Sequence, residues 1–201
     1  MSISNKNFSV VILLLEINIQ CQMIVRAGTR LLECAEHWNL LEQGIDDGKT
    51  EPPIEIVALC TICLSAAASI HRTLFLGKRA GKKAIRIQKR CAALMSILDH
   101  PKLPVINSID VRNSWEHLDE RLDDLLSAKS YNSYSPVHTA AKPPNAGTFV
   151  FRHFDPKLLK IKHGTETICL KALTEETNEL SYSVDKAFKR LQTELCNVYP
   201  S

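Results

Sequence analysis

One stretch of the chain combines an arginine, an asparagine and a histidine at a spacing that suits acid/base chemistry on a phosphate. Arg112 and Asn113 are followed by His117 within residues 112–126, where apolar side chains recur at helical spacing. On a helical wheel Trp115 and the leucines share one arc, whereas His117 lies on the opposite, polar side. A histidine facing away from its own core, one turn after an arginine, either moves a proton or is simply solvated.

The polar side of this helix carries charges of both signs, which allow two interpretations. In one, Glu116 and Arg121 support the pair, and Glu120 holds the ring of His117 in one tautomer. In the other, Arg112 pairs with Glu116 at i, i+4, and His117 interacts with Glu120 or Arg121 at the surface. Carboxylates beside a phosphate site repel an anionic substrate, so the sequence leaves both interpretations open.

A basic run precedes this helix. Between positions 78 and 90 there are seven basic residues and no acidic one. In a helix, Lys82, Arg86, Lys89 and Arg90 share a face, with Lys83 beside them. The run therefore predicts an RNA-binding surface of phosphate-contacting cations. The alternative is a solvated face that offsets acids on a neighbouring helix.

Composition is that of an ordinary globular chain. Its 201 residues, 45% hydrophobic and 23% charged, suffice for one buried core with an extension. The net charge of +3 is too small to identify a nucleic-acid binder, because local clustering of charge matters more. The sequence has no glycine-rich phosphate loop, no HExxH and no nucleophile elbow. Most enzyme classes therefore lose support, and we expect neither a metal nor a cofactor.

The cysteines and the opening segment predict a cytoplasmic protein. Seven cysteines, an odd number mostly in apolar runs, are typical of reduced thiols. Cys60 and Cys63 have redox or zinc spacing, but no second ligand pair follows, which favours buried core thiols. The run over residues 8–20 is apolar for about eight residues before Glu16, short of the roughly 20 that a bilayer requires. We expect a buried helix there and no membrane contact.

The fold class follows from the period of the apolar residues. We predict a mainly all-α protein, an up-and-down bundle of about four to five helices with a small β-hairpin before the C-terminal helix. Helices are expected over residues 6–43, 55–76, 84–99, 112–126 and from about 174 onward. The hairpin is expected from two short strands within residues 148–162.

Three segments organise the chain. Residues 1–126 are expected to form the core of the helical bundle. Residues 127–147, rich in Ser, Tyr, Asn, Pro and Lys, are expected to be a flexible connection. Residues 148–201 are expected to form the hairpin and a C-terminal helix that packs back on the bundle.

The Arg112, Asn113 and His117 pattern, near the start of a late helix in a helical bundle, resembles the HEPN family (higher eukaryotes and prokaryotes nucleotide-binding domains). Active members of that family are metal-independent ribonucleases with an Arg-x4-6-His motif. A wider resemblance, to uncharacterised bacterial HEPN-like proteins, rests on residues 69–72, on residues 112–121 and on residues 151–156 in that order. Only residues 112–121 are specific.

The resemblance implies a homodimer in which the 112–126 helices face each other and form one composite cleft. Arg112 would bind the scissile phosphate as an RNA 2′-hydroxyl attacks it, and His117 would take or give a proton. Asn113 would orient the backbone or the ring of His117. Cleavage would need no metal and would leave a 2′,3′-cyclic phosphate. The implied role is a toxin or phage-defence endoribonuclease, with an antitoxin as a further partner.

A second pair of residues has the same spacing. Arg30 and His37 fit Arg-x4-6-His, but Leu31 follows the arginine where Asn113 follows Arg112. Asn113 and the polar face therefore favour the later pair. Two alternatives to a nuclease remain: a non-catalytic HEPN-like dimer that binds RNA, a nucleotide or a protein, and a purely structural helical protein.

Overall fold

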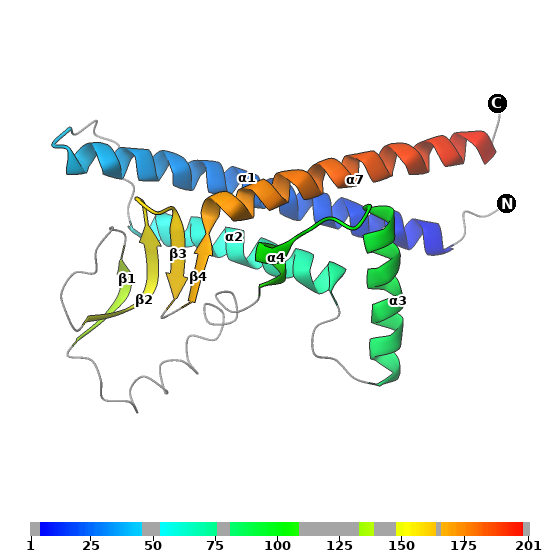
Figure 1. Ribbon diagram of the computed structural model, residues 1–201, viewed down its shortest axis with the longest axis horizontal. Helices are drawn as coiled ribbons and strands as arrows, with labels where there is room; N and C mark the ends of the chain where they lie inside the picture. Colours follow the sequence, from blue (N-terminus) through cyan, green and yellow to red (C-terminus); the bar gives the residue numbers. More distant parts are fainter. Residues whose placement is uncertain are drawn as a thin grey trace.

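The computed structural model describes residues 5–45, 53–75, 81–108, 133–138, 148–163 and 166–198. Its longest element is the helix α1 (Asn5–Glu42), which packs along α2 (Pro53–Leu74) and α7 (Leu170–Val198). Both α2 and α7 run antiparallel to α1 (Figure 1). This up-and-down packing confirms the expected, mainly helical fold.

Local sequence explains where these helices begin and end. Pro53 begins α2, Glu55 lies in its first turn, and His71 and Arg72 lie in its last turn, which suits the helix dipole. Gly44, with a φ of 80°, lies two residues beyond the end of α1. The bounds of α1, α2 and α3 (Lys82–Ile97) lie within two residues of those expected from sequence.

The helix α3 crosses the other long helices steeply, and a short helix, α4 (Pro104–Asn107), follows it (Figure 1). Asp99 and His100 end α3 in the left-handed region, with φ values of 60° and 54°. The backbone N–H of His100 donates to the carbonyl of Met95 at 2.8 Å, which satisfies one carbonyl at the end of the helix.

Four strands form one sheet in the order β1-β2-β3-β4. They are β1 (Ser133–His138), β2 (Thr148–Asp155), β3 (Lys160–His163) and β4 (Glu166–Cys169). The strands β2 and β3 form the expected hairpin, and β4 continues it antiparallel. The strand β1 pairs with β2 in parallel and occupies six residues of the segment expected to be a connection.

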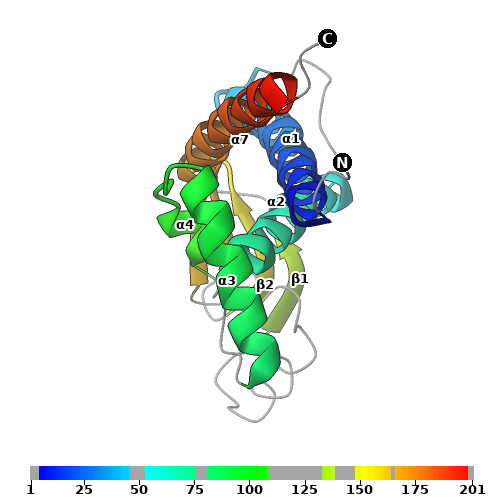
Figure 2. The same cartoon turned by 90° about the vertical axis from the view of Figure 1, so that its right-hand side faces the viewer.

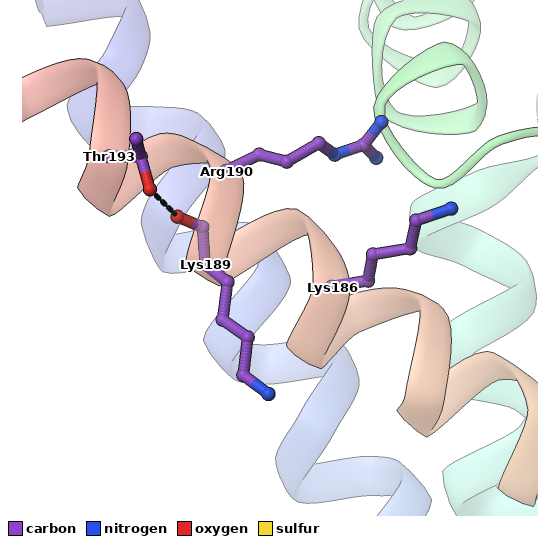
Figure 3. A pocket seen from close by; sticks show the side chains of 4 residues that line it. All are labelled: Lys186, Lys189, Arg190 and Thr193. Atoms are coloured by element: carbon purple, nitrogen blue, oxygen red, sulfur yellow. Dashed lines mark hydrogen bonds between the residues drawn. The ribbon is translucent and has the colours of Figure 1, made fainter.

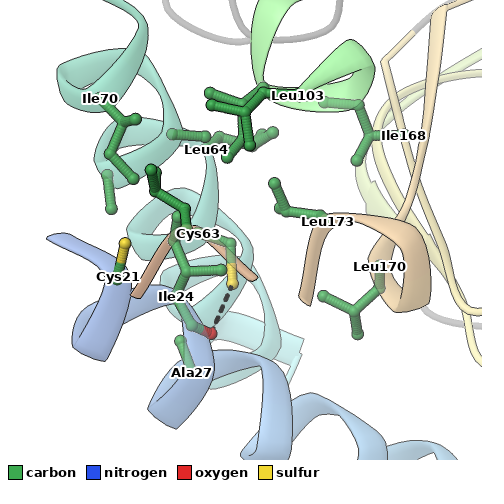
Figure 4. Packing of buried hydrophobic residues seen from close by; sticks show 14 of the residues in the cluster. Cys21, Ile24, Ala27, Cys63, Leu64, Ile70, Leu103, Ile168, Leu170 and Leu173 are labelled. Carbon is green, nitrogen blue, oxygen red and sulfur yellow. Dashed lines mark hydrogen bonds between the residues drawn. The ribbon is translucent and has the colours of Figure 1, made fainter. Parts of the chain in front are cut away.

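One hydrophobic cluster joins the sheet to the helices. Phe154, Ile161 and Ile168 lie in register across β2, β3 and β4, and all three are buried. Figure 4 shows Ile168 beside Leu170 and Leu173 of α7, with residues of α1 and α2 in the same cluster. Residues 148–198 therefore pack on the bundle rather than forming a separate core.

The first half of α1 is buried on one side only. Leu14 and Ile17 are fully buried, whereas Ile12, Leu15 and Ile19 are each about half exposed. By length and composition alone, Ser9–Glu42 and Ile54–Leu74 are long and apolar enough to cross a membrane. Core helices of soluble proteins and signal sequences meet the same criterion, and 28% of the window in α1 and 56% of the window in α2 are buried inside the protein.

Candidate nucleic-acid interface

The predicted catalytic group lies outside the described residues. This holds for Arg112 and His117, for the supporting residues Asn113, Glu116, Glu120 and Arg121, and for the helix expected to form the dimer contact. The competing pair lies within α1. Arg30 there binds Glu33 at 2.8 Å, and His37 is only 6% exposed, so that pair does not form an open site.

The other segments of the wider resemblance bury His71, His153 and Asp155, whereas Arg72 is exposed. His71 is buried and stacks on Phe75, with ring centroids 5.2 Å apart. His153 is buried in β2, and Asp155 at the end of that strand is only 1% exposed. These residues are part of the packed structure.

Asp155 is held by two donors. Its Oδ1 accepts a hydrogen bond from the backbone N–H of Leu158 at 3.0 Å, and its Oδ2 pairs with Nζ of Lys162 at 3.1 Å. Burial raises the pKa of the carboxyl, but the backbone N–H and the ammonium outweigh it, so the pKa lies below its ordinary value. The pair closes the turn between β2 and β3.

The basic helix α3 is the predicted binding element that the structure does describe. Its core face consists of Ala84, Ile87, Cys91 and Leu94, all buried at helical spacing. This orientation leaves four cations exposed to solvent: Lys82, Lys83, Arg86 and Lys89. We call these four residues the α3 cations.

The α3 cations lack carboxylate partners among the residues that the structure describes. By contrast, Arg30, Lys157 and Lys171 each pair with a carboxylate. Like charges at i, i+4 and cations in the first turn of a helix both reduce helix stability by tenths of a kcal/mol. The N-cap, Gly81, offers no side-chain hydrogen bond in return. The alternative of a face that offsets neighbouring acids therefore gains no support from the described ion pairs.

Arg90, the fifth predicted RNA-binding residue, lies apart from this exposed group. It is half-buried, and its Nη2 donates to the backbone carbonyl of Arg72 at 3.2 Å. That carbonyl belongs to the last turn of α2, where carbonyls lack partners within the helix. The Sγ of Cys91 contacts the carbonyl of Thr73 at 3.5 Å in the same turn. These two residues anchor α3 to the end of α2.

The C-terminal end of α3 is anchored to α7. Asp99 pairs with Lys186 and with Arg190, each at 3.0 Å, and Arg190 also donates to the carbonyl of Ile97. Hydrogen bonds from Lys186 and then Arg190 lower the pKa of the Asp99 carboxyl. The helix is thereby held at its middle and at its C-terminal end, and its exposed cations lie on the N-terminal half, between Gly81 and Arg90.

A surface pocket of about 400 Å³ adjoins this contact on α7, lined by Lys186, Lys189, Arg190 and Thr193. Figure 3 shows Lys186 and Arg190 extending toward the end of α3, whereas Lys189 extends elsewhere. Sequence reasoning missed these cations, although their i, i+3, i+4 spacing is a signal of a basic helix face. Because Asp99 pairs with two of them, the pocket carries less positive charge than the α3 cations do.

The described residues contain no group of three or more His, Cys, Asp or Glu side chains arranged for a metal ion. Cys60 and Cys63 are buried in α2, as expected from sequence. The Sγ of Cys63 faces the carbonyl of Ile24 at 3.9 Å. Comparison with known proteins adds no identification: no family model matches the chain, and neither a curated protein nor a solved structure matches it significantly.

Proposed function

We propose that this protein binds RNA through the α3 cations and cleaves it as a metal-independent, HEPN-type endoribonuclease. The observation that carries the binding step is the group of four exposed cations without carboxylate partners among the described residues. A polyanion that contacts such a group releases its condensed counterions, which drives association. RNA, as a polyanion, therefore complements α3 in charge.

The cleavage step rests on the sequence resemblance of Arg112, Asn113 and His117 to the HEPN motif. Arg112 would stabilise the charge on the phosphate, and His117 would transfer the proton during attack by the 2′-hydroxyl. The bond between phosphorus and the 5′-oxygen breaks, so the products carry a 2′,3′-cyclic phosphate and a 5′-hydroxyl. The proposed active form is a homodimer in the cytoplasm, and an antitoxin would be its natural inhibitor.

Binding is tested by replacing Lys82, Arg86 and Lys89 together with Gln, which removes charge without adding bulk. We expect this triple variant to bind labelled RNA at least tenfold more weakly than the wild type. The matched control replaces three exposed cations that have carboxylate partners, namely Arg30, Lys157 and Lys171, also with Gln. Equal loss in both variants would contradict the assignment to α3, because it would show that only total charge matters.

Cleavage is tested with the purified protein, RNA and a chelator. We expect products with cyclic phosphate ends, and we expect them to disappear in His117→Ala and Arg112→Ala. Arg30→Ala is the control, because it removes the exposed arginine of the competing pair. Cleavage that survives His117→Ala contradicts the proposed chemistry. RNA binding without cleavage in the wild type would contradict the nuclease and favour the non-catalytic RNA-binding module.

A further inference from the structure

The composition of the α3 surface bears on the kind of RNA that it would bind. The helix contains no Phe, Tyr, Trp or His. Ile85 and Gln88 are the other exposed side chains between the cations, and Ala92, Ala93 and Ser96 follow them. Proteins that bind single strands stack the unpaired bases on aromatic side chains. The α3 surface offers charge without such stacking partners.

The spacing of the cations also bears on whether α3 would bind single-stranded or double-stranded RNA. Lys82, Arg86 and Lys89 follow at i, i+4 and i+7, so they lie in a row about 10 Å long. Over that length double-helical DNA presents roughly six phosphate charges and either one of its strands roughly three, at about 1.7 and 3.4 Å of axis per charge, and an RNA duplex likewise carries two charged strands. A double helix therefore gives the row about twice the density of negative charge.

The row lies on the N-terminal half of α3, before the contacts that anchor the helix. Arg90 holds the middle of α3 to the end of α2, and Asp99 holds the C-terminal end of α3 to α7. Figure 2 shows the N-terminal end of α3 projecting away from α1 and α7. The helical backbone fixes the spacing of the cations along α3, which matches a partner whose phosphates are also held in fixed positions. A duplex has such phosphates, whereas a free single strand must be ordered first.

From these observations we infer that the α3 cations dock on the phosphate backbone of a double-stranded RNA segment, without reading its bases. This inference rests on the proposed RNA-binding function and names the form of RNA. Recognition of double-stranded RNA through its phosphates and shape is largely independent of sequence. The base-paired part of a folded RNA would thus bind α3.

The experiment measures binding by fluorescence anisotropy to an RNA duplex of about 20 base pairs, to each of its strands alone, and to a second duplex of unrelated sequence. We expect both duplexes to bind with equal affinity, at least tenfold more tightly than either strand. The triple variant with Gln at positions 82, 86 and 89 should lose this preference, and the variant with Gln at positions 30, 157 and 171 should keep it. Thermal unfolding of both variants verifies that they fold.

The outcomes separate this inference from the proposed function. If single strands bind as tightly as duplexes and the triple variant weakens both, the inference is wrong and the RNA-binding function stands. If neither form of RNA binds, the proposed function itself is wrong. The last measurement tests binding to vesicles that contain anionic lipid. If the protein bound these vesicles and no RNA, both proposals would be wrong and α3 would be a membrane-binding surface.

Discussion

The carboxylate of Glu176 in α7 accepts a hydrogen bond from the backbone N–H of Ile106, seventy positions earlier in the chain, at 3.0 Å. Its second oxygen accepts the backbone N–H of Val105 at 2.7 Å. Both donors belong to the first turn of α4, whose N-cap, Leu103, offers no side-chain bond. Glu176 thus caps α4 from another helix and joins α4 to α7.

Replacing Glu176 by Gln should destabilise the protein by about 2 kcal/mol, because a charged acceptor is lost and an amide group then faces two buried N–H donors. Glu175→Gln is the matched control. Glu175 is exposed, and its nearest cation, Lys171, lies 3.9 Å away, so we expect a change below about 0.5 kcal/mol. Denaturant unfolding of the two variants measures the difference. Equal midpoints would show that Glu176 does not cap α4.

Asp155 makes stability depend on pH in the acid range. Because its folded pKa is lowered, its contribution is complete above its ordinary pKa and is lost as the pH falls through the lowered value. Asp155→Asn should cost about 2 kcal/mol at neutral pH and should flatten the decline of stability below about pH 5. Asp185→Asn, at an exposed position of α7, should change neither. If the stability of Asp155→Asn declined below about pH 5 as steeply as that of the wild type, the proposed role of this carboxyl would be contradicted.

The buried cysteines should be unreactive in the folded protein. Burial raises the pKa of Cys21 and of Cys63 to about 12, so at pH 8 about one thiol in ten thousand is ionised. We expect an alkylating reagent to label Cys169, which is only partly buried, before these two. Mass spectrometry of labelled peptides with and without denaturant provides the measurement. Rapid labelling of Cys63 without denaturant would instead support a reactive Cys60 and Cys63 pair.

The pairing of Asp99 with α7 should control the mobility of α3. Asp99→Asn weakens the contacts with Lys186 and Arg190, so the backbone amides of α3 should exchange with solvent several times faster. Lys189→Gln is the control, since Lys189 extends in another direction (Figure 3). Exchange rates in α3 that are unchanged in Asp99→Asn would mean that Arg90 and the apolar contacts alone hold the helix.

Most of the helical architecture could be predicted because the spacing of apolar residues and the positions of Gly and Pro are properties of the local sequence. The ends of α1, α2 and α3 follow from the apolar spacing together with Gly44, Pro53 and Gly81. The start of α7 was expected at 174 but lies at Leu170. Here β4 continues directly into the helix without a loop, and Glu176, close to the expected start, lies in the second turn of α7 and caps α4.

Features that depend on distant partners could not be predicted in this way. The strand β1 is recognisable only through its pairing with β2, and β4 only through its pairing with β3. The helical wheel predicted the exposed side of α3 correctly for Lys82, Lys83, Arg86 and Lys89. It could not separate Arg90 from them, because the carbonyl that binds Arg90 belongs to α2.

The measurement that tests the central claim most directly is the salt dependence of RNA binding by the wild type and by the variant with Gln at positions 82, 86 and 89. Each lost phosphate contact should reduce the slope of log K against log salt concentration by about 0.7 to 0.9. We therefore predict a slope smaller by roughly two to three in the variant, with weaker binding at every salt concentration. The same slope and affinity in both proteins would contradict RNA binding by α3.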